Sequence, residues 1–203
     1  MLREWLRGPG RKDTNLGRDT LPGLVREGRV YAYRFGGYWE DAGTIQAYYE
    51  ANMDLISVSP QLNLYNYRWP ILTNQGNLPP AKTVFDDEGR RGQNLDSLVC
   101  GGCITSGAVV RQSVLGPSCR VHSYALVEGS ILFENVDIGR HARIRNAIID
   151  ENICVPEASR TEWTPEPSET SMRVFSIAEQ DHLGADCLGF LSFLEGAGEL
   201  HLV

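Results

Sequence analysis

The chain of 203 residues is 42% hydrophobic and 22% charged, which is the composition of an ordinary soluble globular protein. Its formal net charge of −7 argues against nucleic acid as a main partner, because phosphate binding rewards clustered Lys and Arg. The sequence has no run of about 18 apolar residues, so we expect no membrane-spanning segment. Five scattered cysteines favour a reducing compartment over a disulfide framework, and we expect a cytoplasmic protein.

The N-terminal segment begins with two short helical patterns. Leu2–Arg7 is typical of the end of a helix and is followed by a Gly-Pro-Gly break. A second short helix through Leu24 and Val25 is expected to end at Gly28. Apolar and polar residues then alternate over Val30–Phe35, which predicts a strand.

A carboxylate and a glycine turn precede the clearest helix of the chain. Thr44 is a suitable N-cap for a helix over Ile45–Leu55. Just before it, Gly43 permits close backbone approach, and the first-turn N–H groups would face a bound anion. Asp41 could therefore hold a cation beside a phosphate, or it could only stabilise the start of the helix. The local chemistry leaves both interpretations open.

Residues 57–97 are expected to form an ordered linker that wraps onto the first coil of the domain that follows. The turn Asp86–Gly89 predicts two short strands, around Val84 and Phe85. Four large apolar side chains of this segment are expected to be buried, namely Trp69, Ile71, Leu72 and Phe85.

Between Leu98 and Val155 the aliphatic residues return every 17 positions. One series is Ile104, Val121, Ile138 and Val155; a second is Val110, Val127 and Ile144; a third is Leu98, Leu115, Leu132 and Ile149, and Ala108, Ala125 and Ala142 keep the same step. Within one period the steps are six, five and six, the spacing of a hexapeptide-type β-helix with three short strands per coil. The span predicts about three and a half coils.

The coils contain histidines and cysteines, residue types that serve in many catalytic and metal-binding sites. His122 and His141 are 19 residues apart, so they do not stack on one ladder, and a zinc site needs three converging ligands. A histidine-based acyltransferase is harder to exclude. Cys100 and Cys103 form one C-x-x-C pair, a weak redox or metal signal, and Cys103 is expected to pack as a small hydrophobe.

Several ordered motifs carry a resemblance to a known family. The stretch from Tyr38 to Thr44 resembles the W-x-D-x-G-T element of sugar-phosphate nucleotidyltransferases. Further motifs are similar to those of the bacterial glucose-1-phosphate adenylyltransferases: Asn15–Asp19 (D-F-G-K-D), Tyr38–Leu55 (Y-W-x-D-V-G-T-I-x-A-Y-x-x-A-N-x-D-L), Trp69–Ile71 (W-P-I), Leu78–Lys82 (L-P-P-A-K) and Ser97–Ile104 (S-L-V-S-G-G-C). The resemblance covers about residues 15–157, and Asn15 departs from the family's pattern.

The resemblance implies that the family reaction is ATP plus glucose-1-phosphate giving ADP-glucose and pyrophosphate, for glycogen or starch synthesis. It also implies that Asp41 holds Mg²⁺ with a second Asp from the nucleotide-binding domain, while Trp39, Gly43 and Thr44 support the motif. No part of this chain matches that second Asp or the ATP-binding segments, so we expect the chain alone to be inactive.

The resemblance further implies an effector cleft lined by basic residues. Arg140, Arg143 and Arg145 lie near that kind of surface, but Glu151 occupies a position that is often basic in the family. We expect effector binding to be impaired or absent.

The expected fold is mainly β: a left-handed parallel β-helix preceded by a small α/β remnant of a nucleotidyltransferase domain. The expected divisions are 1–56 for the remnant, 57–97 for the linker, 98–157 for the β-helix and 158–203 for a divergent, mobile tail. Two other functions stay open, a non-catalytic β-helix module for oligomerisation or regulation and a hexapeptide acyltransferase. We expect oligomerisation through the β-helix both for a part of an adenylyltransferase and for a non-catalytic module.

Overall fold

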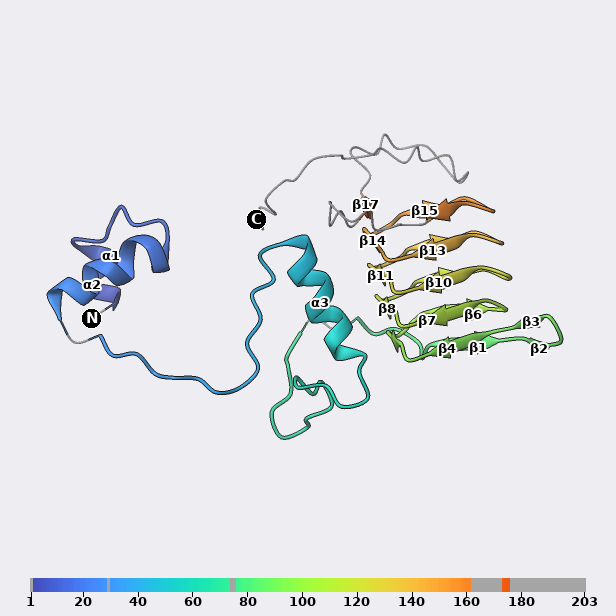
Figure 1. Ribbon diagram of the computed structural model, residues 1–203, viewed down its shortest axis with the longest axis horizontal. Helices are drawn as coiled ribbons and strands as arrows, with labels where there is room; N and C mark the ends of the chain where they lie inside the picture. The colour runs from blue at the N-terminus through green and yellow to red at the C-terminus, as the bar shows by residue number, and fades with distance from the viewer. Residues whose placement is uncertain (1, 29, 74–75, 162–172, 176–203) are drawn as a thin grey trace, which may run out of the picture. The chain divides into compact units, whose positions relative to one another are not determined.

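A computed structural model describes residues 2–28, 30–73, 76–161 and 173–175 of the chain. The chain divides into two compact units, Met1–Gly37 and Tyr38–Val203 (Figure 1). Among the described residues, no helix is both long and apolar enough to cross a membrane.

The first unit is a small helical cluster closed around one tryptophan. It contains helix α1 (Leu2–Arg7), the π-helical turn η1 (Leu16–Thr20) and helix α2 (Leu21–Glu27). The indole of Trp5 lies so close to Gly10 and Gly23 that a Cβ on either would clash with it, and its Nε1 donates to Asp13 at 2.9 Å. Both expected helices are confirmed, and Gly28 ends α2 with φ at +84°.

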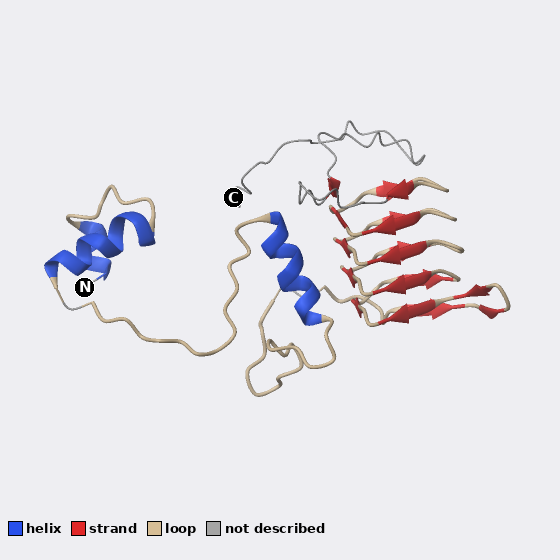
Figure 2. Cartoon of the chain, in the orientation of Figure 1, coloured by secondary structure: helices blue, strands red, loops and turns tan. Residues whose placement is uncertain are grey.

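The strand expected at Val30–Phe35 is not formed. This stretch is irregular and runs between α2 and α3 as a loop (Figure 2). Tyr31 and Tyr33 are 89% and 88% exposed. A strand needs a partner for its N–H and C=O groups, and none of the described residues supplies one here.

The second unit combines helix α3 (Ile45–Leu55) with a parallel β-helix. The strands of the coils are β1 (Lys82–Val84), β4 (Gln93–Leu95), β5 (Leu98–Val99), β6 (Ile104–Ser106), β7 (Val109–Arg111), β8 (Val114–Leu115), β9 (Arg120–Val121), β10 (Leu126–Glu128), β11 (Ile131–Leu132), β12 (Asp137–Ile138), β13 (Arg143–Arg145), β14 (Ala147–Ile149), β15 (Cys154–Val155), β16 (Arg160–Thr161) and β17 (Arg173–Phe175). They form three parallel sheets, in the orders β1-β6-β9-β12-β15, β16-β13-β10-β7-β4 and β17-β14-β11-β8-β5. We call these the β1, β4 and β5 sheets.

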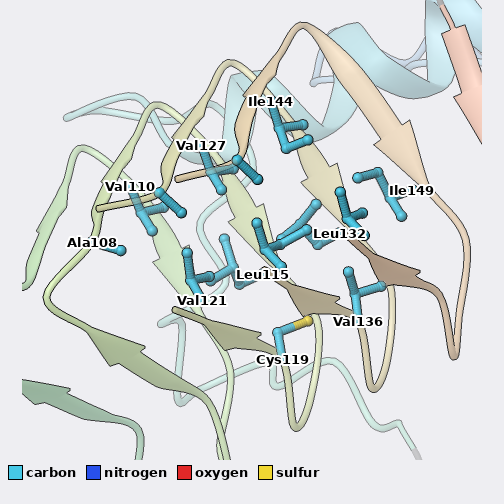
Figure 3. Packing of buried hydrophobic residues seen from close by; sticks show 14 of the residues in the cluster. Ala108, Val110, Leu115, Cys119, Val121, Val127, Leu132, Val136, Ile144 and Ile149 are labelled. Atoms are coloured by element: carbon cyan, nitrogen blue, oxygen red, sulfur yellow. The ribbon is translucent and has the colours of Figure 1, made fainter. Parts of the chain in front are cut away.

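The predicted ladders fill the interior of the coils (Figure 3). Val110 pairs with Val127, which pairs with Ile144, and the three side chains are 0% exposed. Leu115 and Leu132 continue one another in the same way in the β5 sheet. Alternate residues of a strand point to opposite faces, so one aliphatic residue per strand reaches the core. The 17-residue period is confirmed for these coils.

The first coil departs from that period, and the prediction that Ile104 and Leu98 belong to the inward-facing ladders was wrong. Thr105, and not Ile104, lies opposite Val121, and Val99, and not Leu98, lies opposite Leu115. Thr105 is 1% exposed, whereas Ile104 is only partly buried.

A shortened corner explains this shift. From Thr105 to Val110 there are five positions, but from Val121 to Val127 there are six. The missing residue belongs to the corner at Gly107, which stacks on the corner at Tyr124 in the next coil and follows its inward-facing residue by two positions instead of three. A shift of one residue exchanges the two faces of a strand, so the isoleucine turns outward.

The first coil also ends the apolar core with a polar layer. Thr105 Oγ1 donates to Asn94 Oδ1 at 3.0 Å, and Asn94 Nδ2 donates to Thr83 Oγ1 at 2.7 Å. Because β1 and β4 pair with the next coil, the β-helix begins at Lys82, inside the segment 57–97 that was expected to be a linker. At the other end, β16 and β17 extend it beyond Val155, so strands reach into the segment 158–203 that was expected to be the tail. The mobility expected for the tail falls on residues outside the described ones.

A hairpin interrupts the first coil. Strands β2 (Asp86–Asp87) and β3 (Arg90–Arg91) pair antiparallel and project from it (Figure 1). Val84 lies in β1 as expected, but Phe85 does not lie in a strand and has φ at +71°.

The burial expected for four residues of this region was wrong. The exposed fractions are 84% for Trp69, 56% for Ile71, 91% for Leu72 and 40% for Phe85. Only Phe85 has a specific neighbour, the guanidinium of Arg90, which lies 3.6 Å from its ring centre. The other three lie on a loop that no described element covers.

The β5 sheet is apolar on both faces, and α3 lies against its outer face (Figure 1). Ile131 and Ile148 alternate with the core residues of their strands and still are only 2% and 4% exposed. Tyr49 on α3 donates its hydroxyl to the carbonyl of Gly129 at 2.7 Å, and Tyr48 meets Phe133 edge to face at 6.0 Å. The helix therefore covers apolar surface and is fixed to the coils.

Candidate functional site

Asp41 lies in an exposed turn immediately before α3. Its Oδ1 accepts a hydrogen bond from the backbone N–H of Gly43 at 3.2 Å. Thr44 caps the helix as predicted, since its Oγ1 accepts from the N–H of Ala47 at 3.1 Å. The neighbouring Trp39 is 80% exposed. The turn thus presents an exposed carboxylate and, two residues earlier, an uncovered indole just before the start of the helix.

The turn is braced from the helix side. Tyr38 donates its hydroxyl to Asp54 Oδ2 at 3.0 Å, a contact that joins the residue before the motif to the last turn of α3. Desolvation, together with this carboxylate, raises the pKa of Tyr38. Sequence reasoning missed this contact, because the two residues are 16 positions apart and meet only when the chain folds back along the helix.

A metal site of this chain's own is not formed around Asp41. Among the residues that the structure describes, no three His, Cys, Asp or Glu side chains come together as metal ligands. One carboxylate is a weak holder of Mg²⁺, which is usually bound by one or two carboxylates together with substrate phosphates and waters. The donor set present fits part of a magnesium site, and further oxygen ligands have to come from elsewhere.

The helix that follows the Asp41 turn is fixed to the coils by the hydrogen bond from Tyr49 to the carbonyl of Gly129. Gly129, at a corner with φ at +55°, has no side chain to separate Tyr49 from the coil; a Cβ there would lie 3.3 Å from the tyrosine hydroxyl and 2.5 Å from Asn146 Oδ1. A cavity of about 500 Å³ lies beside the contact, between the C-terminal half of α3 and the corners of the coils. The lining is mostly uncharged, with Asp96 at its edge.

The two histidines of the coils lie in different environments. His122 Nε2 is 3.0 Å from Asp137 Oδ1, whereas His141 stacks on Tyr124 with ring centres 4.8 Å apart. The guanidinium of Arg140 lies 5.6 Å from the same tyrosine ring. The two imidazoles therefore have different partners, which agrees with the prediction from their 19-residue spacing that they do not stack on one ladder.

Cys103 and Cys119 are part of the core of the coils. Cys103 is 1% exposed, which confirms its packing role, and its thiol lies 3.0 Å from the carbonyl of Gly116. Its neighbour on the next coil is Cys119, whose hydrogen bond with Cys103, together with burial, raises its pKa. Burial also raises the pKa of the exposed Cys100. The hydrogen bond with Cys119 lowers the pKa of Cys103 to about 7, but Cys103 is buried, so the C-x-x-C pair lacks a thiolate that is both activated and accessible.

Charged residues follow one another on the outer face of the β4 sheet. Arg111, Glu128 and Arg145 are in register on β7, β10 and β13, and Arg145 Nε is 3.1 Å from Glu128 Oε2. Together with the β2–β3 hairpin they line a cavity of about 630 Å³. Of the three arginines expected at an effector surface, only Arg145 lines it, and it already binds a carboxylate. The 17-residue spacing of these charges was a signal for this ladder.

Two family models match the sequence. The model described as "GlmU-like, C-terminal hexapeptide" matches residues 79–180, and the model described as "Nucleotidyl transferase" matches residues 3–58. The similarity thus extends beyond both ends of the stretch 15–157 that the motifs covered.

Curated relatives match both parts together. The glucose-1-phosphate adenylyltransferase of Trichlorobacter lovleyi is 59% identical over 161 residues, which are 73% of this chain and 39% of the relative. That of Geobacter metallireducens is 55% identical over 180 residues, 82% of this chain and 43% of the relative. That of Nitrosospira multiformis is 47% identical over 161 residues, 74% of this chain and 38% of the relative. The chain therefore spans about two fifths of the length of these relatives, in their C-terminal part.

Proposed function

Because this chain belongs to the family of GlmU-like, C-terminal hexapeptide domains, preceded by a nucleotidyl transferase match, we propose that it is the C-terminal part of a glucose-1-phosphate adenylyltransferase. The reaction is the transfer of the adenylyl group of ATP to glucose-1-phosphate, with release of pyrophosphate, in the cytoplasm. The observation that carries the proposal is the exposed Asp41 turn at the N-terminus of α3, a helix that Tyr49 fixes to the coils.

In this proposal Asp41 supplies one ligand to Mg²⁺. The bound ion would neutralise charge on the reacting phosphates. Gly43 holds the carboxylate by its N–H and leaves room for a ligand, and Thr44 sets the start of the helix behind it. The second carboxylate and the nucleotide-binding segments belong to the part of the relatives that this chain does not cover, so the isolated chain is inactive.

A chimera tests this function. The 203-residue chain replaces the matched C-terminal part of the Trichlorobacter lovleyi relative, and ADP-glucose formation is measured with ATP, glucose-1-phosphate and Mg²⁺. We expect turnover by the chimera and none by the isolated chain.

The role of Asp41 is tested in the same chimera. Asp41→Asn should lower turnover roughly 100-fold or more, the scale expected for losing one group that stabilises transition-state charge. Glu40→Gln, which changes the adjacent exposed carboxylate, is the matched control and should leave turnover within about twofold. A chimera that folds but is inactive would refute the proposal that this chain is part of the enzyme. ADP-glucose made by the isolated chain and abolished by Asp41→Asn would refute the proposal that the chain is inactive alone.

A second candidate is a non-catalytic module for assembly. Its specific support is the exposed apolar loop between α3 and β1, in which Tyr67, Trp69 and Leu72 are 84–91% exposed. Such a loop is unfavourable in water and suits contact with another protein surface. Light scattering of the isolated chain separates the candidates: a stable homo-oligomer together with an inactive chimera would favour the module.

The acyltransferase interpretation has a weaker basis. His122 is oriented by Asp137, as a general base would be. However, the cavity of about 630 Å³ is not lined by His122. Binding of acetyl-CoA to the chain in calorimetry would revive this interpretation.

A further inference from the structure

Two cysteines flank one turn of the first coil. Gly101 and Gly102 form the centre of this turn, between Cys100 and Cys103. Gly102 has φ at +77°, as the third residue of a type II β-turn does. A β-turn brings the Cα atoms of its two ends within about 7 Å, and disulfides join Cα atoms that are about 4.4–6.8 Å apart. The turn therefore holds the two cysteines at a separation that a disulfide can bridge.

Cys100 is a departure of this chain from the motif that the turn resembles. The motif S-L-V-S-G-G-C matches Cys103, but it has a serine where this chain has Cys100. On the next two coils the equivalent corner positions are occupied by Gly116 and Phe133, because each of these residues donates its N–H to the coil that follows in the same way. Packing of the coils therefore does not require a thiol at this position.

Accessibility and activation are divided between the two thiols. Cys100 is exposed, although desolvation and then the neighbouring Cys103 raise its pKa. Cys103 is 1% exposed, and the hydrogen bond with the Cys119 thiol, helped by backbone hydrogen bonds with Cys119 and Cys100, lowers its pKa to about 7. The bond with the backbone of Cys100 places the sulfur of Cys103 beside the residue that it would have to reach.

We propose that Cys100 and Cys103 form a reversible disulfide, made by exchange with a low-molecular-weight disulfide that first reacts at Cys100. The thiolate of Cys100 attacks one sulfur of the small disulfide and displaces the other as a thiolate, which leaves a mixed disulfide on the protein. The thiolate of Cys103 then attacks the sulfur of Cys100 and displaces the second small thiolate. The protein loses two hydrogen atoms in total, and the small disulfide is reduced to two thiols.

Burial of Cys103 does not prevent the second step, because the sulfur that it attacks is already within the same turn. A disulfide between Cys103 and Cys119 is a poorer alternative. These two residues are 1% and 0% exposed, so a small disulfide reaches neither of them. Disulfides with an exposed sulfur belong to the labile class that cellular thiols reduce again, which agrees with the reversibility proposed for this pair.

Mass spectrometry of tryptic peptides tests the proposal. Trypsin releases residues 92–111, which contain Cys100 and Cys103, whereas Cys119 lies on the peptide of residues 112–120. The reduced 203-residue chain is incubated with glutathione disulfide, and the remaining free thiols are alkylated in denaturant. We expect the first peptide to lose two hydrogen atoms and to take up no alkyl group. A first peptide that stays fully alkylated, that keeps glutathione or that is linked to the second peptide would overturn the proposal.

Two variants separate the two steps. Cys103→Ala should stop the reaction at the mixed disulfide, so that glutathione remains on Cys100. Cys100→Ser, which restores the residue of the motif, should leave the same peptide without glutathione and without a disulfide. Glutathione on Cys103 in the Cys100→Ser variant would show that the small disulfide reaches the core, and the proposed order of steps would then be wrong.

Cys119 is a positioning residue in this proposal, and the pH dependence of the second step tests its role. In the unmodified chain the rate of this step should rise with pH to a midpoint near the pKa of Cys103, about 7. Cys119→Ala removes the thiol donor and should move the midpoint toward the ordinary cysteine value of about 8.5. Cys119→Ser keeps a donor and should hold the midpoint near its original position. Equal midpoints in all three proteins would overturn the role given to Cys119.

Discussion

The coils bury their apolar side chains within the chain, whereas the segments that precede them leave many apolar side chains exposed. In the coils, each ladder of like residues buries its neighbours, and the interior side chains Val110, Val127 and Ile144 are 0% exposed. Before the coils, aromatic and aliphatic side chains as large as Trp69 and Tyr31 are more than four fifths exposed. The two parts have the same ordinary share of apolar residues, so the contrast lies in what is present to cover them.

The contrast separates a self-sufficient scaffold from a segment that depends on other protein. A coil finds its partners one turn before and after it in the same sequence, 16 or 17 residues away. The Asp41 turn and the stretch Val30–Phe35 have no such repeat. Their partners are sequence-distant, and we expect them in the nucleotidyltransferase portion.

The largest effect that we expect compares two leucines. Leu132 is 1% exposed in the core and Leu72 is 91% exposed on the loop before β1. Leu132→Ala should lower the free energy of unfolding by about 2–5 kcal/mol, because it removes buried atoms and leaves a cavity. Leu72→Ala should change it by no more than about 0.5 kcal/mol. Urea denaturation of the isolated chain measures both, and similar losses would show that the loop is covered in solution.

A ladder of serine hydroxyls gives the next largest effect. Ser130 Oγ accepts from the N–H of Ala147 at 3.2 Å and donates to the carbonyl of Glu128 at 2.8 Å, and Ser113 makes the equivalent pair one coil earlier. Ser130→Ala leaves the N–H of the buried Ala147 without its acceptor, which should cost about 1–3 kcal/mol.

The control for this ladder is Ser57→Ala, at an exposed position after α3. It should be neutral within about 0.5 kcal/mol in the same urea experiment. A neutral Ser130→Ala would mean that water or a backbone shift replaces the hydroxyl, and that the coils are less closely packed than the contrast requires.

Much of the fold could be predicted from the sequence because it is periodic. The ladder from Leu115 to Leu132 follows directly from spacing, and the N-cap at Thr44 follows from local chemistry. The first coil could not be placed, because Ile104 keeps the spacing of 17 while the short corner at Gly107 turns Thr105 inward instead. A corner that is one residue shorter cannot be detected from the sequence when a larger apolar residue, here Ile104, lies next to the residue that faces the core.

The site could be predicted only as far as its local part reaches. Asp41 and Thr44 lie where the motif placed them, since a turn and a cap need no distant residues. The hydrogen bond from Tyr49 to Gly129 spans 80 residues and leaves no local pattern. The strand at Val30–Phe35 failed as a prediction for a related reason: strand propensity describes what a segment favours, and pairing requires a neighbour that these described residues do not supply.

A smaller effect is expected where the two parts meet. Tyr49→Phe keeps the ring on the coil and removes only the hydrogen bond to the carbonyl of Gly129, so we expect a loss of about 0.5–1.5 kcal/mol. Tyr31→Phe, at a position that is 89% exposed, is the matched control and should be neutral. Hydrogen exchange of the α3 amides adds a local readout, and unchanged protection in Tyr49→Phe would mean that the ring contacts alone fix the helix.

The smallest effect concerns acid and the first unit. Asp19 Oδ2 accepts from the N–H groups of Thr14 and Asn15, and Arg18 lies beside its other oxygen; the bond from Thr14, then Arg18, lowers the pKa of this carboxyl below its ordinary value. Unfolding would therefore take up a proton at pH values between the folded and the unfolded pKa. The stabilisation is complete above the unfolded pKa and is lost as the pH falls through the folded one. NMR titration of this exposed carboxyl should show the lowered pKa. Asp19→Asn should weaken the acid dependence of the first unit and leave that of the β-helix unchanged. If the coils lost structure at the same pH as the first unit, the independence of the two parts would be refuted.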